Sequence, residues 1–329
     1  MLNKELKLNP DIFNKDIEKI AIRTGFGEGL LTSADRDENV VGLCADLTDS
    51  TKMRAFADKY PKRFIQVGVA EQNLASVASG MASMGKIPFI TSYAMFSPGR
   101  NWEQIRTTVC YNNVPVKIAG SHAGISVGPD GGTHQAIEDI ALMRVIPRMV
   151  VISPCDSIEA KKATIAAAQT TDPTYIRLAR NNTSVITTEE TPFEIGKAQV
   201  VYKNEGADVA MIATGHLVHN AILAAKELED KGIKVVVCNM STIKPLDINM
   251  INELVADAGA LVTIEEHQVM GGLGSAVAEH VTSNNPVPIE FIGVKDEFGQ
   301  SGTPEQLIEH YKMGVSHIIE AAEKVVSRK

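Results

Sequence analysis

The stretch RFIQVGVAEQNLASVASGMASMG, residues 63–85, joins an apolar run to a run of small residues. Val and Ile in RFIQVGV (63–69) are typical of a buried β-strand. Ala, Ser and Gly fill the segment after it, which indicates a helix that packs closely against another backbone. Glu71 stands between the two runs. The stretch therefore predicts a buried strand, a turn and a helix, with a carboxylate at the turn.

Similar apolar runs recur through the first half of the chain and alternate with segments of helical character. This alternation predicts an α/β fold with a parallel sheet that helices cover on both faces. The further runs are VVGLCAD (40–46), IPFITSY (87–93), VPVKIAG (114–120), MVVISP (149–154) and PTYIRLA (173–179).

A polar stretch with a proline and no helical period, NNTSVITTEETPFE (181–194), predicts a linker. A smaller α/β unit is expected after it, so that the domains are 1–185 and 186–329, in keeping with a length of 329 residues. Its expected elements are DVAMIATG (208–215), a helix over 216–231, IKVVVCNM (233–240), LVTIEEH (261–267), the helix after GGLGSA (271–276) and PIEFIGV (288–294).

Composition narrows the classes of protein. The formal net charge of -8 gives no electrostatic reason to expect nucleic acid as a partner. No apolar stretch reaches 18 residues and the N-terminus lacks the apolar core of a signal peptide, so no membrane association is expected and a cytoplasmic location is predicted. Four cysteines stand far apart, which predicts reduced thiols: Cys44, Cys110, Cys155 and Cys238.

Polar segments follow four of the predicted strands. Ligands of open parallel sheets bind beyond the carboxyl ends of the strands, so these segments are the first candidates for a site. They are ADLTDS (45–50), AEQN (70–73), YAMFSPGRNW (93–102) and SHAGISVGPDGGTHQ (121–135).

Glu71 has two interpretations. One is a helix N-terminal acid, but a capping box requires Ser or Thr at the position that Gly68 occupies. The other is a buried functional acid, because a carboxylate that leads into a tightly packed helix needs a partner for its charge. The position alone leaves both open.

The segment SHAGISVGPDGGTHQ combines His122, Asp130 and His134 with several glycines. Glycine lets a ligand approach the backbone closely. One loop histidine is usually only solvated, but the three polar side chains together can donate and accept the hydrogen bonds that polyol recognition requires. We therefore predict that this loop binds a ligand.

The segment EEHQVMGGLGSAVAEH (265–280) has a weak likeness to a phosphate loop. It lacks the spacing of a Walker motif and of the dinucleotide fingerprint. Its glycines are predicted to allow close packing of a strand on a helix, and His267 is assigned no role.

Three segments resemble the transketolase family: VGVAEQNLASVASGMASMGKIPF (67–89), SHAGISVGPDGGTHQAIEDIALMR (121–144) and EEHQVMGGLGSAVAEHV (265–281). The resemblance covers nearly the whole chain and is to the pyrimidine-binding and C-terminal domains of the split form, in which the enzyme is two polypeptides. It implies a thiamine-diphosphate-dependent transfer of a two-carbon ketol unit from a ketose phosphate to an aldose phosphate.

The resemblance also implies roles for residues near the cofactor. A glutamate at the position of Glu71 hydrogen-bonds a pyrimidine nitrogen of thiamine diphosphate and activates the cofactor. Phe96 matches the aromatic residue that packs on the pyrimidine ring. Asp46 and Leu47, in ADLTDS, are assigned to the same cofactor site.

For the substrate, the resemblance implies that His122, Asp130 and His134 hold the hydroxyls and carbonyl of the sugar, with both histidines among the catalytic residues beside Glu71. His122 is expected near the phosphate end as well. Gly132 stands where single-chain enzymes usually have proline. The implied acceptors of the sugar phosphate are Arg23, Ser50 and Arg180.

The family's GDG motif, which with a later asparagine holds the cofactor diphosphate and Mg²⁺, does not occur in the sequence. The resemblance therefore implies a partner, an N-terminal subunit with that motif, in an α2β2 assembly. The partner holds most of the Mg²⁺ site, and no metal ligand is assigned to this chain.

Three alternatives stay open at this point. The β subunit of a 2-oxo-acid dehydrogenase has the same glutamate but is not expected to carry GPDGGTHQ. Deoxyxylulose-phosphate synthase shares the loop but is normally one long chain that includes the GDG motif. A catalytically silent scaffolding or regulatory subunit has no physical need for a buried acid beside a histidine loop.

Overall fold

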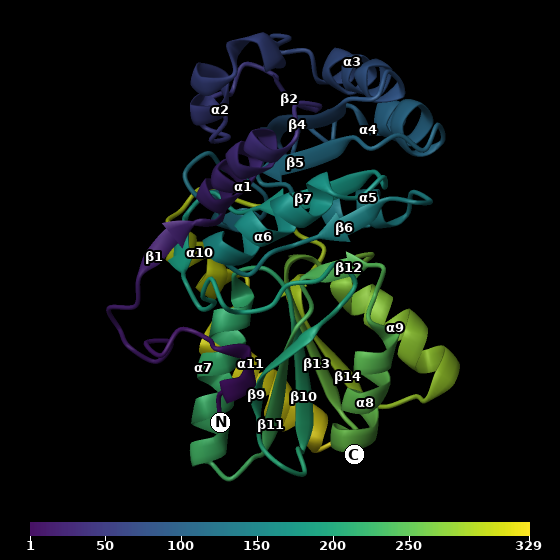
Figure 1. The fold of residues 1–329 in the computed structure, drawn as a ribbon. Coiled ribbons are helices and arrows are strands. Elements are labelled where there is room, and N and C mark those ends of the chain that lie inside the picture. The colour runs from purple at the N-terminus through teal and green to yellow at the C-terminus, as the bar shows by residue number, and fades with distance from the viewer.

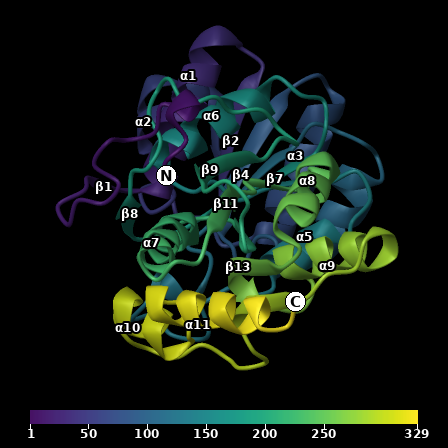
Figure 2. The same cartoon turned by 90° about the horizontal axis from the view of Figure 1, so that it is seen from below.

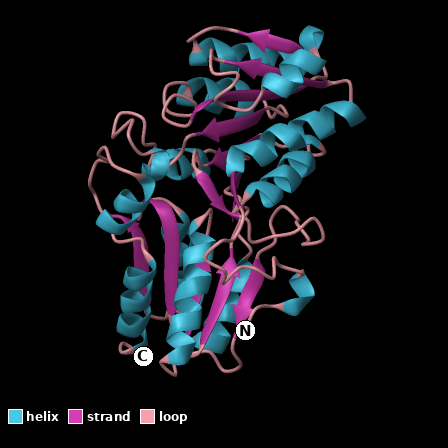
Figure 3. Cartoon of the chain, turned by 90° about the vertical axis from the view of Figure 1, so that its left-hand side faces the viewer, coloured by secondary structure: helices cyan, strands magenta, loops and turns pink.

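The computed structural model describes residues 1–329 and consists of two α/β units, one above the other in Figure 1. Each unit is built on its own sheet, and the strands of the two sheets run in different directions (Figure 3). The predicted fold class, a parallel-sheet domain followed by a smaller α/β domain, is confirmed.

The first unit has a seven-stranded sheet in the order β12-β6-β7-β5-β4-β2-β3, parallel except for β12. The central strands are buried along their whole length, because helices cover both faces. The strands are β2 (Val40–Cys44), β3 (Phe64–Gln66), β4 (Ile87–Tyr93), β5 (Lys117–Ser121), β6 (Val150–Ile152), β7 (Thr174–Leu178) and β12 (Thr242–Lys244).

Helices α1 and α6 contribute to the core on one face of this sheet, and α3 contributes to the core on the other. The helices of the unit are α1 (Ile22–Arg36), α2 (Arg54–Lys59), α3 (Glu71–Ser83), α4 (Trp102–Gln104), α5 (Asp139–Arg144) and α6 (Ser157–Ala168), with a π-helical segment over Ile105–Cys110.

The second unit has a five-stranded sheet in the order β14-β13-β10-β11-β9, in which β9 runs antiparallel. Helices α7 and α11 pack on one face and α8 and α9 on the other (Figure 2). The elements are β9 (Gln199–Lys203), β10 (Val209–Ala213), α7 (Leu217–Asp230), β11 (Val235–Asn239), α8 (Ile248–Ala258), β13 (Leu261–Gln268), α9 (Leu273–Asn284), β14 (Ile289–Val294), α10 (Pro304–His310) and α11 (Val315–Val326).

Two sequence expectations are wrong in part. The run 63–69 forms only the three-residue strand β3, which is partly exposed because it lies at the edge of the sheet and has one neighbouring strand. The stretch expected as a linker contains β8 (Asn182–Ser184), which pairs with β1 (Lys19–Ala21). Both strands depend on partners that are distant in sequence, so local pattern does not reveal them.

Two segments cross between the units. Strand β12 follows β11 in the chain but joins the first sheet beside β6. The N-terminal residues lie against the second sheet, where Lys203 donates its backbone N–H to Met1 and Asn3 donates to Val201. The division at 185 and 186 stays a prediction, and the crossing segments bind the two units together.

All four cysteines are buried and carry free thiols. Burial raises the pKa of Cys110 to about 12. No helix of the structure has both the length and the apolar character needed to cross a membrane.

Candidate functional site

The loops after β4, β5 and β7 leave the first sheet at one level. Tyr93 at the end of β4 pairs with Ser121 at the end of β5, and Ser121 pairs with Leu178 at the end of β7. Because the strands are parallel, the loops that follow them begin side by side at the carboxyl edge. Several of the predicted site residues lie on these loops.

Glu71 is the first residue of α3, and its side chain is only 2% exposed. Ser92 donates a hydrogen bond of 3.2 Å from its hydroxyl to one carboxylate oxygen. Arg100 donates from Nη1 to the other at 2.7 Å. Asn101 donates from its amide to the Glu71 carbonyl at 2.9 Å. The acid is thus buried, and its partners come from β4 and the loop after it.

An aromatic cluster lies next to this acid. The ring of Tyr93 stacks on that of His122 with centroids 3.8 Å apart and lies 6.2 Å from Phe96. His134 meets Phe96 edge to face at 5.5 Å. The Arg100 guanidinium lies 5.0 Å from the centre of the Phe96 ring. The cluster therefore connects the partner of Glu71 with both predicted histidines.

Two arginines lie near enough to the cluster for their charges to lower the pKa of His122. Arg23, at the start of α1, donates from Nε to the Arg180 carbonyl at 3.1 Å and from Nη1 to the Ser50 carbonyl at 2.6 Å. Burial lowers the pKa of Arg23, and the charge of Arg180 lowers it further. Neither guanidinium forms an ion pair with a carboxylate, so the two cations can attract an anion.

His122 lies between the aromatic cluster and the arginines. Burial lowers the pKa of His122 to about 3, and the charges of Arg23, Arg180 and His134 act in the same direction. Its backbone has a positive φ of 56°, which is uncommon outside glycine. Ser121 Oγ lies 2.9 Å from Nδ1. The imidazole is therefore neutral at pH 7, and Nε2 is left for another partner.

The loop 121–135 is held by the second unit. Ser126 donates its backbone N–H to the Glu266 carboxylate at 2.6 Å, and Gln135 donates from Nε2 to the Gln300 carbonyl at 3.0 Å. Gly124 allows the first contact, because a Cβ there would lie 2.4 Å from the Glu266 carboxyl carbon. At Gly132 a Cβ would lie 2.6 Å from the Gly299 carbonyl oxygen, so a side chain there requires a shift of residue 299.

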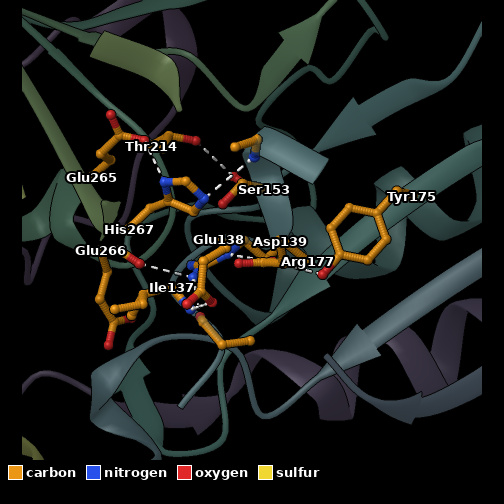
Figure 4. A network of polar contacts seen from close by, with 12 residues as sticks. Ile137, Glu138, Asp139, Ser153, Tyr175, Arg177, Thr214, Glu265, Glu266 and His267 are labelled. Atoms are coloured by element: carbon orange, nitrogen blue, oxygen red, sulfur yellow. Dashed lines mark hydrogen bonds and ion pairs between the residues drawn. The ribbon is translucent and has the colours of Figure 1, made fainter. Parts of the chain in front are cut away.

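A buried polar network lies behind this loop (Figure 4). Arg177 on β7 pairs with Asp139 at 2.9 Å and donates from Nη2 to the Glu266 carbonyl at 2.8 Å. Tyr175 donates its hydroxyl to Asp139 at 2.6 Å. Burial opposes the charge of Glu266, but His216, 2.7 Å away, and Arg177 outweigh it and lower its pKa. The network fixes the end of β13 against the first unit.

Three predicted residues lie apart from these contacts. Asp130 is exposed and makes no hydrogen bond or ion pair. Asp46 is exposed, has a positive φ of 60°, and donates its backbone N–H to Gln66 at 2.7 Å. Leu47 is half-buried and packs against the core. No hydrogen bond or ion pair joins these residues to Glu71 or to the histidines.

The N-terminus of α9, in the GGLG segment, is occupied by a side chain of the protein. Glu265 accepts the N–H groups of Leu273 and Gly274, both at 2.8 Å. A Cβ at Gly272 would lie 2.0 Å from a Glu265 oxygen. The glycines thus allow close packing of strand and helix. His267 is buried, and its Nε2 accepts the Ala141 N–H at 3.3 Å.

Sequence reasoning missed three residues that touch predicted ones: Ser92, Tyr93 and Arg100. All three belong to the end of β4 or the polar segment that follows it. The only sequence signal for these residues was their position at or after the carboxyl end of a strand. Every residue of the segment shares that position, so it could not single out these three.

A cavity of about 750 Å³ lies elsewhere, between β8, α7 and α11, and none of the predicted site residues lines it. No group of three or more metal-ligating side chains comes together in the structure.

Two family models match the chain. The model described as "Transketolase, pyrimidine binding domain" matches residues 18–185, and the one described as "Transketolase, C-terminal domain" matches residues 196–318. These two matches define a subunit with the domain pair of thiamine-diphosphate-dependent enzymes. The chain belongs to the transketolase family, as the sequence predicted.

Relatives of similar length support the split form. A putative transketolase C-terminal section of Methanocaldococcus jannaschii is 43% identical over 88% of this chain and 91% of that protein. The 6-deoxy-6-sulfo-D-fructose transketolase subunit SqwH of Clostridium sp. is 40% identical over 96% and 98%. A subunit of the apulose-4-phosphate transketolase of Phocaeicola vulgatus is 34% identical over 94% and 98%.

A solved structure of a split-gene transketolase, an inactive β4 tetramer, is 41% identical, with a TM-score of 0.87 over 94% of this chain and 99% of that one. The transketolase of Leishmania mexicana, at 24% identity and a TM-score of 0.82, shares the fold over 98% of this chain and 48% of its own. The likenesses to split-gene transketolases and to separate transketolase subunits imply an N-terminal partner subunit for this chain.

Proposed function

We propose that this chain is the C-terminal subunit of a cytoplasmic transketolase that moves a two-carbon ketol unit from a ketose phosphate to an aldose phosphate. The observation that carries the proposal is a row of groups at the carboxyl edge. Contacts lead from the buried acid Glu71 through the aromatic cluster to His122, and Arg23 and Arg180, which have no ion-pair partner, lie near enough to lower the pKa of His122.

The residues present fit the pyrimidine half of thiamine diphosphate. Glu71 is buried, and the carboxylate oxygen that accepts from Ser92 can accept a further hydrogen bond from a ring nitrogen. Phe96 offers an aromatic surface beside it. Asp46 and Leu47, which follow β2 beside β3, are proposed to belong to the same site. When bound, the cofactor supplies an electron sink for carbon–carbon bond cleavage.

In this proposal Arg23, Ser50 and Arg180 hold the phosphate of the sugar, with His122 near them. Arginine suits this role because its planar fork gives two hydrogen bonds to phosphate oxygens. His134 and Asp130 act on the hydroxyls and carbonyl nearer the reacting carbons. Thr133 lies 3.0 Å from Nδ1 of His134, so Nε2 of that ring is free to bind substrate.

The diphosphate and Mg²⁺ require groups from a partner, which we propose carries a GDG motif and forms an α2β2 assembly. The surface next to Glu71 supports this. Val69 is 71% exposed and Met84 is 84% exposed, at the two ends of α3. A Cβ at Gly80 meets nothing within 4 Å. Exposed apolar side chains at both ends of a helix that has small residues on its open face are suited to close packing by another subunit.

The arginine pair also limits the substrates. It recognises a tetrahedral anion at the end of the sugar, and a sulfonate presents the same arrangement of oxygens as a phosphate. Relatives named for a sulfofructose and for apulose 4-phosphate are both similar to this chain. We therefore propose an anionic ketose as donor and leave its carbon skeleton to experiment.

The test is to co-express this chain with the reading frame beside its gene and to screen ketose donors with ribose 5-phosphate as acceptor. The proposal expects ketol transfer that requires thiamine diphosphate and Mg²⁺ and is lost with Glu71→Gln. A stable complex that transfers no ketol unit from any phosphorylated or sulfonated donor would contradict the proposal and favour a silent scaffolding subunit.

A further inference from the structure

Arg100 is the one cation that touches the buried acid. Its Nη1 lies 2.7 Å from the Glu71 carboxylate, whose side chain is 2% exposed, while the Arg100 side chain itself is 47% exposed. The remaining guanidinium N–H groups make no hydrogen bond to the protein. The contact therefore joins a fixed, buried acceptor to a half-exposed side chain with freedom to move.

The ion pair between Arg177 and Asp139 shows the difference. There both side chains are buried, at 5% and 1% exposed, and Arg177 also donates to a carbonyl of the second unit. Arg177 cannot move away from Asp139 without leaving the buried charge of that carboxylate unpaired. Arg100 already lies over the Phe96 ring, 5.0 Å from its centre, and its half-exposed side chain can turn away from the acid into solvent, where its charge stays hydrated.

Glu71 cannot share a proton with a pyrimidine nitrogen and at the same time keep its full ion-pair interaction with Arg100. A neighbouring guanidinium stabilises the ionised form of a carboxylate. A carboxyl group that shares a proton with a ring nitrogen must be able to hold that proton. The ring and the guanidinium thus compete for the same carboxylate.

We propose that Arg100 is a positioning residue whose side chain takes two alternative positions. It pairs with Glu71 in the subunit that holds no cofactor, and it leaves the carboxylate when the pyrimidine ring binds. The proposal rests on the proposed function, because it takes thiamine diphosphate as the competing ligand. In the subunit without cofactor, Arg100 neutralises the buried charge of Glu71. When the cofactor binds in the assembly, Arg100 moves away and the carboxylate becomes available to the pyrimidine ring.

The first arm of the test is a double-mutant cycle on the isolated full-length chain. Arg100→Ala leaves the buried carboxylate without its cation, so the melting temperature should fall by about 2 to 6 °C. In the Glu71→Gln background there is no charge to neutralise, and the same change should shift it by only about 1 °C. Equal losses in both backgrounds would overturn the pairing.

The second arm measures thiamine diphosphate binding to the complex with the partner subunit, by calorimetry. Because Arg100 stabilises only the free state, Arg100→Ala should tighten binding, by about 3- to 10-fold. Arg100→Lys, which keeps the charge without the fork, should fall between that variant and wild type. A purely structural arginine would weaken binding or leave it unchanged.

Arg328→Ala is the matched control. Arg328 is equally exposed, at 47%, and pairs with Glu290 in the second unit, far along the chain from the acid. It should leave the dissociation constant unchanged. If Arg100→Ala weakened binding, the proposed release of Arg100 would be wrong. The proposed function would stand, because the wild-type complex still binds the cofactor. A wild-type complex that binds none would overturn the proposed function and the release with it.

Discussion

The acid end and the histidine loop of the site are built in different ways. Glu71 takes its partners from β4 and the loop after it, and that loop leaves Arg100 half-exposed. The loop 121–135 is held by Glu266 and Gln300 of the second unit and by a buried network behind it. This chain therefore holds the proposed substrate-binding loop between its own two units, whereas the acid, proposed to bind the cofactor, lies beside a half-exposed arginine on the side where a partner is proposed.

The largest expected effect is at the acid end. Glu71→Gln keeps the shape and the hydrogen bond from Ser92 but removes the acidic group, so activation of the cofactor in the assembled enzyme should slow by about 100- to 10,000-fold. Exchange of the thiazolium C2 proton, followed by NMR after quenching, measures this step. Exchange at the wild-type rate in a correctly folded variant would show that Glu71 does not activate the cofactor.

At the substrate end, Arg180→Ala should raise KM for phosphorylated donors by about 10- to 100-fold, because a charge-assisted hydrogen bond contributes about 1.5 to 3 kcal/mol. Turnover of unphosphorylated hydroxypyruvate should change little, and the C2 proton should exchange at the wild-type rate. An equal loss on both donors would point to a structural role for Arg180.

The pH dependence of the free energy of unfolding tests whether the site keeps His122 neutral. Its pKa is about 3 in the folded chain, against an ordinary value near 6.5. The unfolded chain therefore takes up the proton first, so the contribution of neutral His122 is present above pH 6.5 and is lost as the pH falls toward 3. Wild type should lose about 2.5 kcal/mol relative to His122→Asn between pH 7 and pH 4.5.

Denaturant unfolding of both proteins at the two pH values checks this. Burial also raises the pKa of Glu265 to about 7, which acts in the opposite direction, but both proteins share that group and the difference cancels it. A difference between the two proteins that stays constant with pH would show that His122 is not kept neutral by its site.

The smallest effect concerns support of the loop by the second unit. Gln135→Leu removes donors to the Ile125 and Gln300 carbonyls. KM for a phosphorylated donor should rise about threefold, since a neutral hydrogen bond contributes about 0.5 to 1.5 kcal/mol. C2 proton exchange should not change. A variant that slows exchange as much as it raises KM would show that the two ends are not built separately.

The sequence predicted the long central strands well, because an apolar run such as 87–93 carries its own signal; β4 has those bounds. It did not predict β8, β9 or β12, whose pairing depends on distant segments. Glu71, His122 and His134 stood out as unusual residues after strands. The contacts of Arg100 and Tyr93 did not, because they depend on the conformation of a loop that has no period.

The support of the histidine loop by the second unit was beyond sequence pattern as well. Ser126 and Glu266 are separated by more than a hundred residues, as are Gln135 and Gln300, and only the folded chain brings the members of each pair into contact. Asp130 illustrates the opposite case, since a conspicuous polar residue lies exposed without a partner in this chain.

The central claim is that this chain supplies only part of a site that a partner completes. The most direct measurement compares ketol transfer to ribose 5-phosphate from the anionic ketose that the donor screen identifies, with thiamine diphosphate and Mg²⁺, by the purified chain alone and by the chain mixed with its N-terminal partner. We expect no turnover above background alone and turnover on the order of 1 to 1,000 per second for the mixture. Turnover at such a rate by the chain alone would contradict the account.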